Sequence, residues 1–262
     1  MEDGAMAWIE LDGAVNVRDV GGLPTTDGGK IAEGRLLRGD NLDSLTPADV
    51  DRLVTELGLA TIVDLRSTQE HAAASPGPLA AVASVRHVRY SLLPEPGVLA
   101  DTPAGTLAAR AERALARCPD DVRAGFYLGY LDDRPAGVVG ALRAIATSPG
   151  PALVHCAAGK DRTGVIIALA LSVAGAEPAA VSADYAASAE KIDAILTRLR
   201  GMAAYSAGVQ IASVLDQTPQ AATMDAFLAA LDASHGGAAG WLAEHGFGAE
   251  ETAGLRARLR DG

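Results

Sequence analysis

The segment from residue 151 to residue 174 constrains the fold of this chain more than any other. Residues 151–155 form a short apolar run of buried-strand character, small residues and glycine follow, and an apolar helical run extends from 164 to 174. A strand, a tight loop and a helix in this order are the unit of an α/β sheet. The loop also lies at a helix N-terminus, where free N–H groups and the helix dipole favour an anion. We therefore expect an α/β protein with an anion site at this loop.

Elsewhere the sequence alternates between strand-like and helical runs. Strands are predicted at residues 8–11, 35–38, 61–65 and 85–92, and helices at 47–57, 121–130 and 135–147, with further helices towards the C-terminus. This alternation favours a central, mainly parallel sheet flanked by helices, in a single domain over residues 1–262. Residues 94–134 begin as a loose stretch rich in Pro, Ala and Gly, and we expect a helical lid insertion there.

Composition excludes several classes of function. The net charge is −11 and the sequence pI is about 4.8, so we expect neither general nucleic-acid binding nor broad adhesion to anionic membranes. Two cysteines give no disulfide framework and the histidines have no metal-ligand spacing, so no metal or cofactor is expected. No apolar run reaches the ~20 residues of a membrane-spanning helix, and no signal peptide is recognisable. We expect a cytoplasmic protein, with secretion without a cleaved signal left open.

Cys156 and Arg162 are the candidate catalytic residues of the loop. A cysteine at a helix N-terminus beside cations is favoured as the thiolate, which is the nucleophilic form. Arg162, six positions further on, has a planar guanidinium that can bind two phosphoryl oxygens at once. We expect Thr163 to donate its hydroxyl to the thiolate. The phosphate-binding residues are then predicted to be Ala157, Ala158, Gly159, Lys160, Asp161, Arg162 and Thr163.

Two aspartates are candidates for the acid that protonates the leaving group. Asp161 lies within the loop and is the first choice, and Asp64, at the end of another predicted strand, is the second. Lys160 adds a second cation to the loop and is one of only three lysines in the chain. Two nucleotide-binding loops are excluded. Val154 and Asp161 stand where a Walker-A loop needs Gly and Ser or Thr, and no Gly-x-Gly-x-x-Gly occurs.

Residues around the loop have supporting interpretations. We expect His155 to fix the loop by hydrogen bonds, and Arg18 and Asp19 to pair with each other or to cap the Gly-Gly turn that follows them. Arg66 with Glu70 fits a solvent-exposed helical i,i+4 pair. Cys118 is expected to have no chemical role. Packing roles are predicted for Trp241, Tyr127 and Tyr130, although the two tyrosines also fit the wall of a lid groove.

The stretch from His155-Cys156 to Arg162-Thr163-Gly164 resembles the signature of the cysteine-dependent tyrosine and dual-specificity phosphatases. Its Gly-Lys-Asp-Arg-Thr-Gly ending is similar to that of the bacterial tyrosine/lipid phosphatases of the mycobacterial type. Other blocks that resemble this family are residues 16–22, 38–39, 63–70, 184–188 and 240–246. The resemblance covers most of the chain and is weakest over residues 94–120, where that family has a variable lid. No Trp-Pro-Asp acid loop is present, so the acid must lie elsewhere.

The resemblance implies a cysteinyl-phosphate mechanism without metal or cofactor. Cys156 attacks phosphorus, Arg162 and the loop amides hold the oxygens, an acid protonates the leaving group, and water hydrolyses the phosphocysteine. We predict a protein tyrosine phosphatase of wider specificity, acting on phosphorylated proteins, peptides or small molecules and also on phosphoinositides. Two alternatives stay open: a nucleotide or sugar/inositol phosphate phosphatase of the same fold, and a phosphate-binding pseudophosphatase, which would not need the nucleophile.

Overall fold

A six-stranded sheet organises the molecule. The computed structural model describes residues 7–74, 76–94, 107–205 and 217–260. The strands are β1 (Ala7–Trp8), β2 (Arg18–Asp19), β3 (Leu36–Gly39), β4 (Thr61–Asp64), β5 (Arg86–Arg89) and β6 (Ala152–His155). Their order is β1-β2-β3-β6-β4-β5. The pairs β3–β6, β6–β4 and β4–β5 are parallel, and β1–β2 and β2–β3 are antiparallel. The predicted central, mainly parallel sheet is confirmed.

Alternating side chains of the strands supply two cores. Successive residues of a strand point to opposite faces of the sheet. In β6, Val154 joins the larger hydrophobic cluster and Leu153 the smaller one; in β4, Val63 and Ile62 divide in the same way. All four positions are buried. Both faces of the sheet are therefore covered, which explains why β4 and β6 are apolar runs rather than alternating ones.

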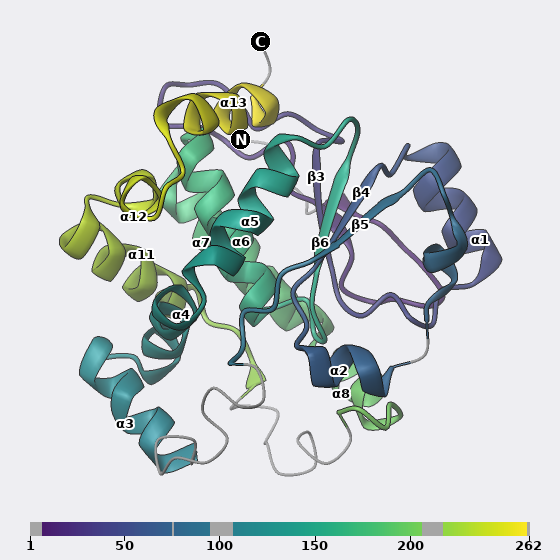
Figure 1. Ribbon diagram of the computed structural model, residues 1–262, viewed down its shortest axis with the longest axis horizontal. Coiled ribbons are helices and arrows are strands. Elements are labelled where there is room, and N and C mark those ends of the chain that lie inside the picture. The colour runs from purple at the N-terminus through teal and green to yellow at the C-terminus, as the bar shows by residue number, and fades with distance from the viewer. Residues whose placement is uncertain (1–6, 75, 95–106, 206–216, 261–262) are drawn as a thin grey trace.

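Helices cover the two faces unequally. Those described are α1 (Pro47–Asp51), α2 (Thr68–Ala73), α3 (Leu107–Arg117), α4 (Val122–Asp133), α5 (Pro135–Ala146), α6 (Asp161–Ala174), α7 (Pro178–Ala187), α8 (Ile192–Arg200), α11 (Ala221–His235), α12 (Ala238–Glu244) and α13 (Ala249–Leu259), with the single-turn elements η1 (Arg52–Glu56), η2 (Pro78–Ala81) and η4 (Ser188–Lys191). In Figure 1, α5, α6 and α7 lie on one side of the sheet and α1 on the other. The larger cluster packs under the first group.

Helix ends follow the local sequence signals closely. Thr46 caps α1 in a capping box with Asp49, and Asp121 caps α4 by accepting from two backbone N–H groups, so both predicted helix starts are confirmed. Gly175 ends α6 in the left-handed conformation, with φ of 86°. One prediction needs correction: α6 begins at Asp161, not at Gly164. The end of the phosphate-binding stretch is therefore already helical.

The predicted lid insertion, residues 94–134, lies partly outside the described residues, since 95–106 are among those not described. Its described part contains α3 and α4. The two helices pack so closely that a Cβ at Gly125 would lie 1.9 Å from the carbonyl oxygen of Ala114. Tyr127 and Leu131 of α4 are each 1% exposed and belong to the larger core. The lid itself stays a prediction.

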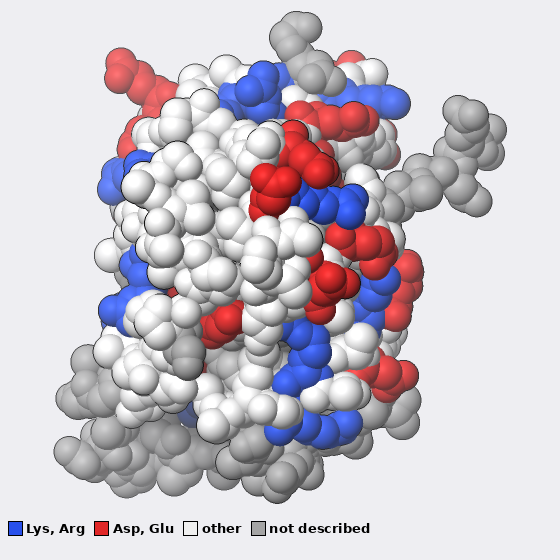
Figure 2. Space-filling model, turned by 90° about the vertical axis from the view of Figure 1, so that its right-hand side faces the viewer, with Lys and Arg blue, Asp and Glu red and all other residues white. Residues whose placement is uncertain are grey.

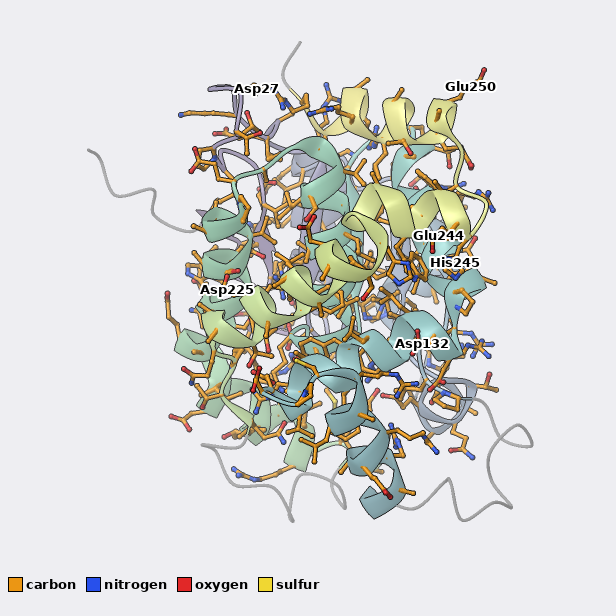
Figure 3. The ribbon with its side chains drawn as sticks, turned by 90° about the vertical axis from the view of Figure 1, so that its left-hand side faces the viewer. Asp27, Asp132, Asp225, Glu244, His245 and Glu250 are labelled. Carbon is orange, nitrogen blue, oxygen red and sulfur yellow. The ribbon has the colours of Figure 1, made fainter. Side chains whose placement is uncertain are left out.

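The C-terminal helices bury several aromatic residues, of which Trp241 is the largest. Trp241 of α12 is 2% exposed, and the His245 ring stacks on it with centroids 4.0 Å apart. Figure 3 labels His245 next to Glu244, at the end of α12. The packing role predicted for Trp241 is confirmed. Cys118, predicted to have no chemical role, is a buried free thiol in the larger core.

The described surface agrees with the acidic composition. On the face shown in Figure 2, acidic and basic side chains are interspersed and form no continuous basic patch. Within the described ranges, no helix is long and apolar enough to cross a bilayer. The same part of the chain contains no group of three or more His, Cys, Asp or Glu side chains arranged to hold a metal ion.

Candidate active site

The loop between β6 and α6 turns its carbonyl groups away from its centre. Three of them accept hydrogen bonds from surrounding elements: Asn41 N donates to Ala157 O (3.0 Å), Asn16 Nδ2 to Ala158 O (3.0 Å) and Arg38 Nη2 to Gly159 O (2.9 Å). Among the described residues, no backbone acceptor takes the N–H groups of residues 157–162. A loop with its carbonyls held outward and its N–H groups free is a nest for an anion.

Gly159 makes the tight turn of this loop possible. Its φ is +70°, a conformation that side chains with a Cβ rarely adopt. A Cβ there would also lie 2.5 Å from the Gly39 carbonyl oxygen, at the end of β3. The loop is therefore packed directly against the neighbouring strand, and only glycine fits at this position.

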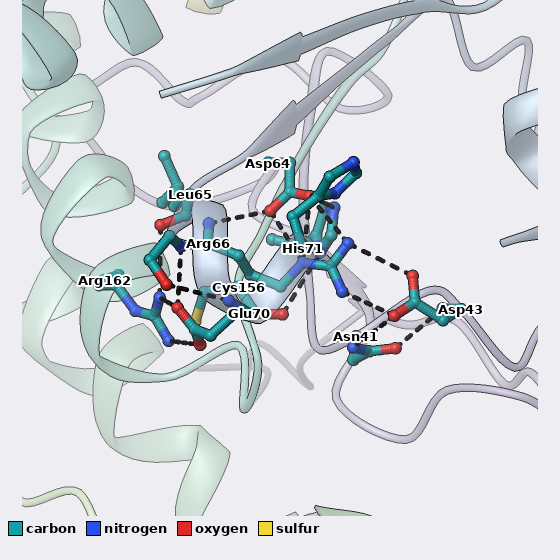
Figure 4. A network of polar contacts seen from close by, with 11 residues as sticks. Asn41, Asp43, Asp64, Leu65, Arg66, Glu70, His71, Cys156 and Arg162 are labelled. Carbon is teal, nitrogen blue, oxygen red and sulfur yellow. Dashed lines mark hydrogen bonds and ion pairs between the residues drawn. The ribbon is translucent and has the colours of Figure 1, made fainter. Parts of the chain in front are cut away.

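Cys156 begins the loop at the carboxyl end of β6. Its side chain is 2% exposed, and Figure 4 shows its sulfur beside Arg162 and Glu70. The predicted hydrogen bond from Thr163 is wrong: the Thr163 hydroxyl is fully buried and has no hydrogen-bond partner among the described residues.

Arg162 is oriented by the carboxylate of Glu70, which the sequence analysis paired with Arg66 instead. Its Nη1 and Nη2 donate to Glu70 Oε2 (2.6 Å) and Oε1 (2.8 Å). This end-on pairing uses one N–H of each terminal nitrogen and leaves the Nε edge of the guanidinium for two phosphoryl oxygens. The predicted exposed Arg66–Glu70 pair is therefore wrong, because Glu70 turns inward to Arg162 from α2. Glu70 also accepts from Ser67 N (2.8 Å), which caps α2.

Asp161 is held at both of its carboxylate oxygens. Lys160 Nζ donates to Oδ2 (2.7 Å) and the Tyr127 hydroxyl donates to Oδ1 (2.5 Å). Burial opposes ionisation, but the Lys160 charge, the Lys160 hydrogen bond and the Tyr127 hydrogen bond together lower the pKa of Asp161. The side chain of Asp161 is 28% exposed while that of Lys160 is only 4% exposed. The free site therefore presents an ionised, oriented carboxylate at its mouth.

Asp64 lies behind the loop and is engaged by a different cation. Its carboxylate accepts from the Arg66 backbone N–H (2.9 Å), from Arg66 Nε (3.0 Å to each oxygen) and from Arg66 Nη2 (2.8 Å). Burial opposes ionisation, but His155 and Arg66 hold the pKa of Asp64 well below its usual range. Arg66 extends the network to Asp43, as Figure 4 shows. This geometry favours a loop-supporting role for Asp64 over proton donation.

His155 contacts the loop in the manner expected of a supporting residue. Its Nδ1 lies 3.3 Å from the Cys156 carbonyl oxygen, and its Nε2 lies 3.9 Å from Asp64 Oδ2. Burial lowers the pKa of His155, so the imidazole is neutral near pH 7. A neutral ring can donate one hydrogen bond to the loop carbonyl without adding charge.

Two buried arginines hold the loop from below through one shared carboxylate. Arg18 Nε donates to Asp184 Oδ1 (2.9 Å), and Arg38 Nη1 donates to Asp184 Oδ2. Burial and the nearby Arg38 charge lower the pKa of Arg18 to about 10. One carboxylate thus faces two guanidinium groups, which leaves an excess positive charge beneath the anion nest. Such a charge stabilises a bound phosphoryl group.

The predicted pairing of Arg18 with Asp19 is wrong, because adjacent residues of a strand point to opposite faces. Asp19 instead accepts from Gly21 N (2.9 Å) and Gly34 N (2.5 Å), so the alternative, capping of the Gly-Gly turn, is confirmed. The Asp184 partnership was missed: the sequence shows Asp184 only within a block that resembles a family, 166 positions from Arg18.

These features define a class of protein. A cysteine at the carboxyl end of a parallel strand, an outward-turned loop with free amides, and an arginine paired with a carboxylate match the site expected of a cysteine-dependent phosphatase.

Comparison with known proteins identifies the family. A model described as "Tyrosine phosphatase family" matches residues 9–261, and the chain belongs to this family. It is 31% identical over 230 residues to a tyrosine-protein phosphatase from Nostoc commune, covering 85% of this chain and 73% of that protein. It is also 31% identical over 217 residues to the triple specificity protein phosphatase PtpB of Mycobacterium tuberculosis, covering 75% of each. A solved structure of TpbA from P. aeruginosa is more distant, with 18% identity and a TM-score of 0.40 over 87% of this chain and 98% of that one. The chain is an enzyme with phosphatase activity.

Proposed function

We propose that the chain hydrolyses phosphotyrosine through a phosphocysteine formed on Cys156. The observation that supports this most directly is the position of Cys156 beneath the free N–H groups of the loop, with Arg162 oriented beside it by Glu70. The Cys156 thiolate supplies the electron pair for the new S–P bond, and the P–O bond to the leaving group breaks. Arg162 and the loop amides stabilise the charge that accumulates on the equatorial oxygens.

Asp161 is our proposed general acid. It is the first residue of α6 and its side chain is 28% exposed, whereas Asp64, at the end of β4, is bound by Arg66. In the free site Asp161 is ionised, but a phosphoryl dianion placed beside it raises the pKa of the carboxyl and competes for Lys160. The protonated carboxyl then gives its proton to the leaving oxygen. The resulting carboxylate takes a proton from the water that attacks the phosphorus atom of the phosphocysteine. A P–O bond forms and the S–P bond breaks, which releases phosphate and restores the Cys156 thiolate.

The substrate class is proposed more broadly than phosphotyrosine. The M. tuberculosis relative is named a triple specificity protein phosphatase. In this chain Lys160 Nζ bonds only the carboxylate of Asp161 among the described groups, and a further phosphate on the substrate can replace that carboxylate as its partner. We therefore propose phosphotyrosine proteins as the main substrates, with phosphoserine/threonine peptides and phosphoinositides as further ones, in a cytoplasmic setting.

The test compares kcat/KM for a phosphotyrosine peptide, a phosphoserine peptide, a phosphoinositide and a nucleotide monophosphate. Cys156→Ser serves as the background control, and Cys118→Ser as the matched control, since Cys118 is also a buried free thiol but lies between α3 and α4 rather than at the end of β6. We expect the phosphotyrosine peptide to be the best substrate and every activity to vanish in Cys156→Ser alone. A nucleotide preferred over both peptides would assign the chain to small-molecule metabolism. Binding without turnover by the unmodified enzyme would make it a pseudophosphatase.

A further inference from the structure

Two tyrosine hydroxyl groups form a line behind Asp161. The Tyr127 hydroxyl lies 2.5 Å from Asp161 Oδ1, and the Tyr185 hydroxyl lies 2.7 Å from that of Tyr127. Both residues are 1% exposed, and their rings meet edge to face with centroids 6.0 Å apart. Tyr127 comes from α4 and Tyr185 from α7, so two separate helices supply this arrangement.

The loop sequence leaves room for the second tyrosine. A Cβ at Gly164 would lie 2.8 Å from Cδ2 of Tyr185, so glycine in the first turn of α6 allows the ring to approach the loop. A T-shaped contact between Tyr127 and Phe227, with centroids 6.2 Å apart, holds the first ring from the opposite side. Neither hydroxyl can move far without a repacking of the core.

The direction of the hydrogen bonds follows from proton counting. An ionised carboxylate only accepts, so Tyr127 donates its single proton to Asp161, and Tyr185 must donate to the Tyr127 oxygen. Burial raises the pKa of Tyr127 well above its usual value and that of Tyr185 to about 12, so both hydroxyls stay protonated near neutral pH. Both donors therefore point towards the carboxylate.

We propose that Tyr127 is a positioning residue for the acid Asp161, and that Tyr185 supports it as a second donor. The Tyr127 hydroxyl fixes the carboxyl group at the loop mouth and stabilises the anion that remains when the proton leaves with the product oxygen. This inference rests on the proposed acid role of Asp161. In that step the O–H electron pair stays on the carboxylate oxygen. The hydrogen bond from Tyr127 is stronger to this charged carboxylate than to the neutral acid.

Other charged and titratable groups also face Asp161, and they too influence the pKa of its carboxyl group. They are Lys160 from the loop, Arg123, Tyr127 and Tyr130 from α4, and Tyr185 from α7. Although burial opposes it, the nearby hydroxyls and Asp161 raise the pKa of Arg123, so this guanidinium stays charged. Tyr130 stacks on Tyr127 at 5.9 Å, but its hydroxyl makes no hydrogen bond to Asp161 in the described structure.

The test is the alkaline limb of the kcat–pH profile, measured with phenyl phosphate for the wild type, Tyr127→Phe, Tyr185→Phe and Tyr130→Phe. A hydrogen bond to a charged group is worth enough to move a pKa by about one to two units. Removing a hydrogen-bond donor to the carboxylate raises the pKa of Asp161. In Tyr127→Phe the alkaline limb should therefore shift to higher pH by about one unit or more. Tyr185→Phe should move it less in the same direction, and Tyr130→Phe should leave it in place.

The outcomes separate this inference from the proposed function. Asp161→Asn should abolish the alkaline limb; if it does not, the acid assignment fails. If Asp161→Asn abolishes the limb while Tyr127→Phe leaves it at the wild-type pH, or moves it no more than Tyr130→Phe, the positioning role is overturned. A ¹³C titration of the Asp161 carboxyl in the Cys156→Ser background gives the same comparison without turnover. Circular dichroism checks that each variant is folded.

Discussion

Replacing Asp184 by Asn tests the buried support of the loop. The side chain is 2% exposed and is the shared partner of Arg18 and Arg38, whose side chains are both 0% exposed. Asn cannot carry the negative charge, so two guanidinium groups would remain buried without a counter-ion. Breaking a buried ion pair from one side costs about 3–5 kcal/mol. For a chain of 262 residues that corresponds to a fall in Tm of roughly 5–9 °C.

The pH dependence provides a sharper version of this test. Burial opposes ionisation, but Arg18 and Arg38 lower the pKa of Asp184 in the folded state. A carboxyl with a depressed folded pKa contributes stability that is fully present above its unfolded pKa, about 3.9, and is lost as pH falls through the folded pKa. The difference between wild type and Asp184→Asn should therefore be full at pH 7 and shrink in strongly acidic buffer.

Urea unfolding followed by circular dichroism, at pH 7 and at a series of lower pH values, measures this difference. Asp132→Asn is the matched control, because Asp132 pairs with Arg117 at the surface and its side chain is 55% exposed (Figure 3). We expect little change in that variant. The reasoning is refuted if Asp184→Asn is no more destabilising than Asp132→Asn, or if its effect is independent of pH.

Further results are expected from three variants and from inhibitors. Lys160→Ala should lower kcat/KM for a multiply phosphorylated phosphoinositide more than for a phosphotyrosine peptide; equal losses would make Lys160 purely structural. Asp161→Asn should slow phenyl phosphate by about 10²-fold or more, and activated aryl phosphates far less, because a good leaving group needs no acid. Asp64→Asn should lower both rates by a similar factor, and leaving-group sensitivity in that variant alone would transfer the acid role to it. Activity should survive EDTA and be blocked by vanadate, whose trigonal-bipyramidal adduct imitates the transition state; dependence on an added divalent metal would contradict the thiolate scheme.

The fold and the loop were predictable because their signals are local. An apolar run, a tight loop with glycine and an apolar helix are written in consecutive residues, so β6, the loop and most of α6 follow from the sequence. The same holds for the helix caps at Thr46 and Asp121, where the capping residue stands next to the helix that it begins.

The supporting contacts were not predictable because their partners lie far apart in the chain. Glu70 is 92 positions from Arg162, and helical spacing alone assigned it to Arg66. Tyr127 is 34 positions from Asp161, and only the packing of α4 against α6 brings the two together. A tyrosine in an apolar helix gives no sign of whether its hydroxyl has a partner. The predicted Arg66–Glu70 pair failed for a different reason: Arg66 precedes α2, which begins at Thr68, so helical i,i+4 spacing does not apply to it.

The most direct test of the central claim is to trap the phosphoenzyme. Asp161→Asn is mixed with a ³²P-labelled activated aryl phosphate, whose leaving group departs without an acid while water attack lacks its base. The reaction is quenched in acid within milliseconds and the labelled peptide is identified by mass spectrometry. We predict that the label is found on Cys156 and is absent when Cys156→Ser is added to the same background. Label on another residue, or turnover by Cys156→Ser at a rate near that of wild type, would contradict the mechanism.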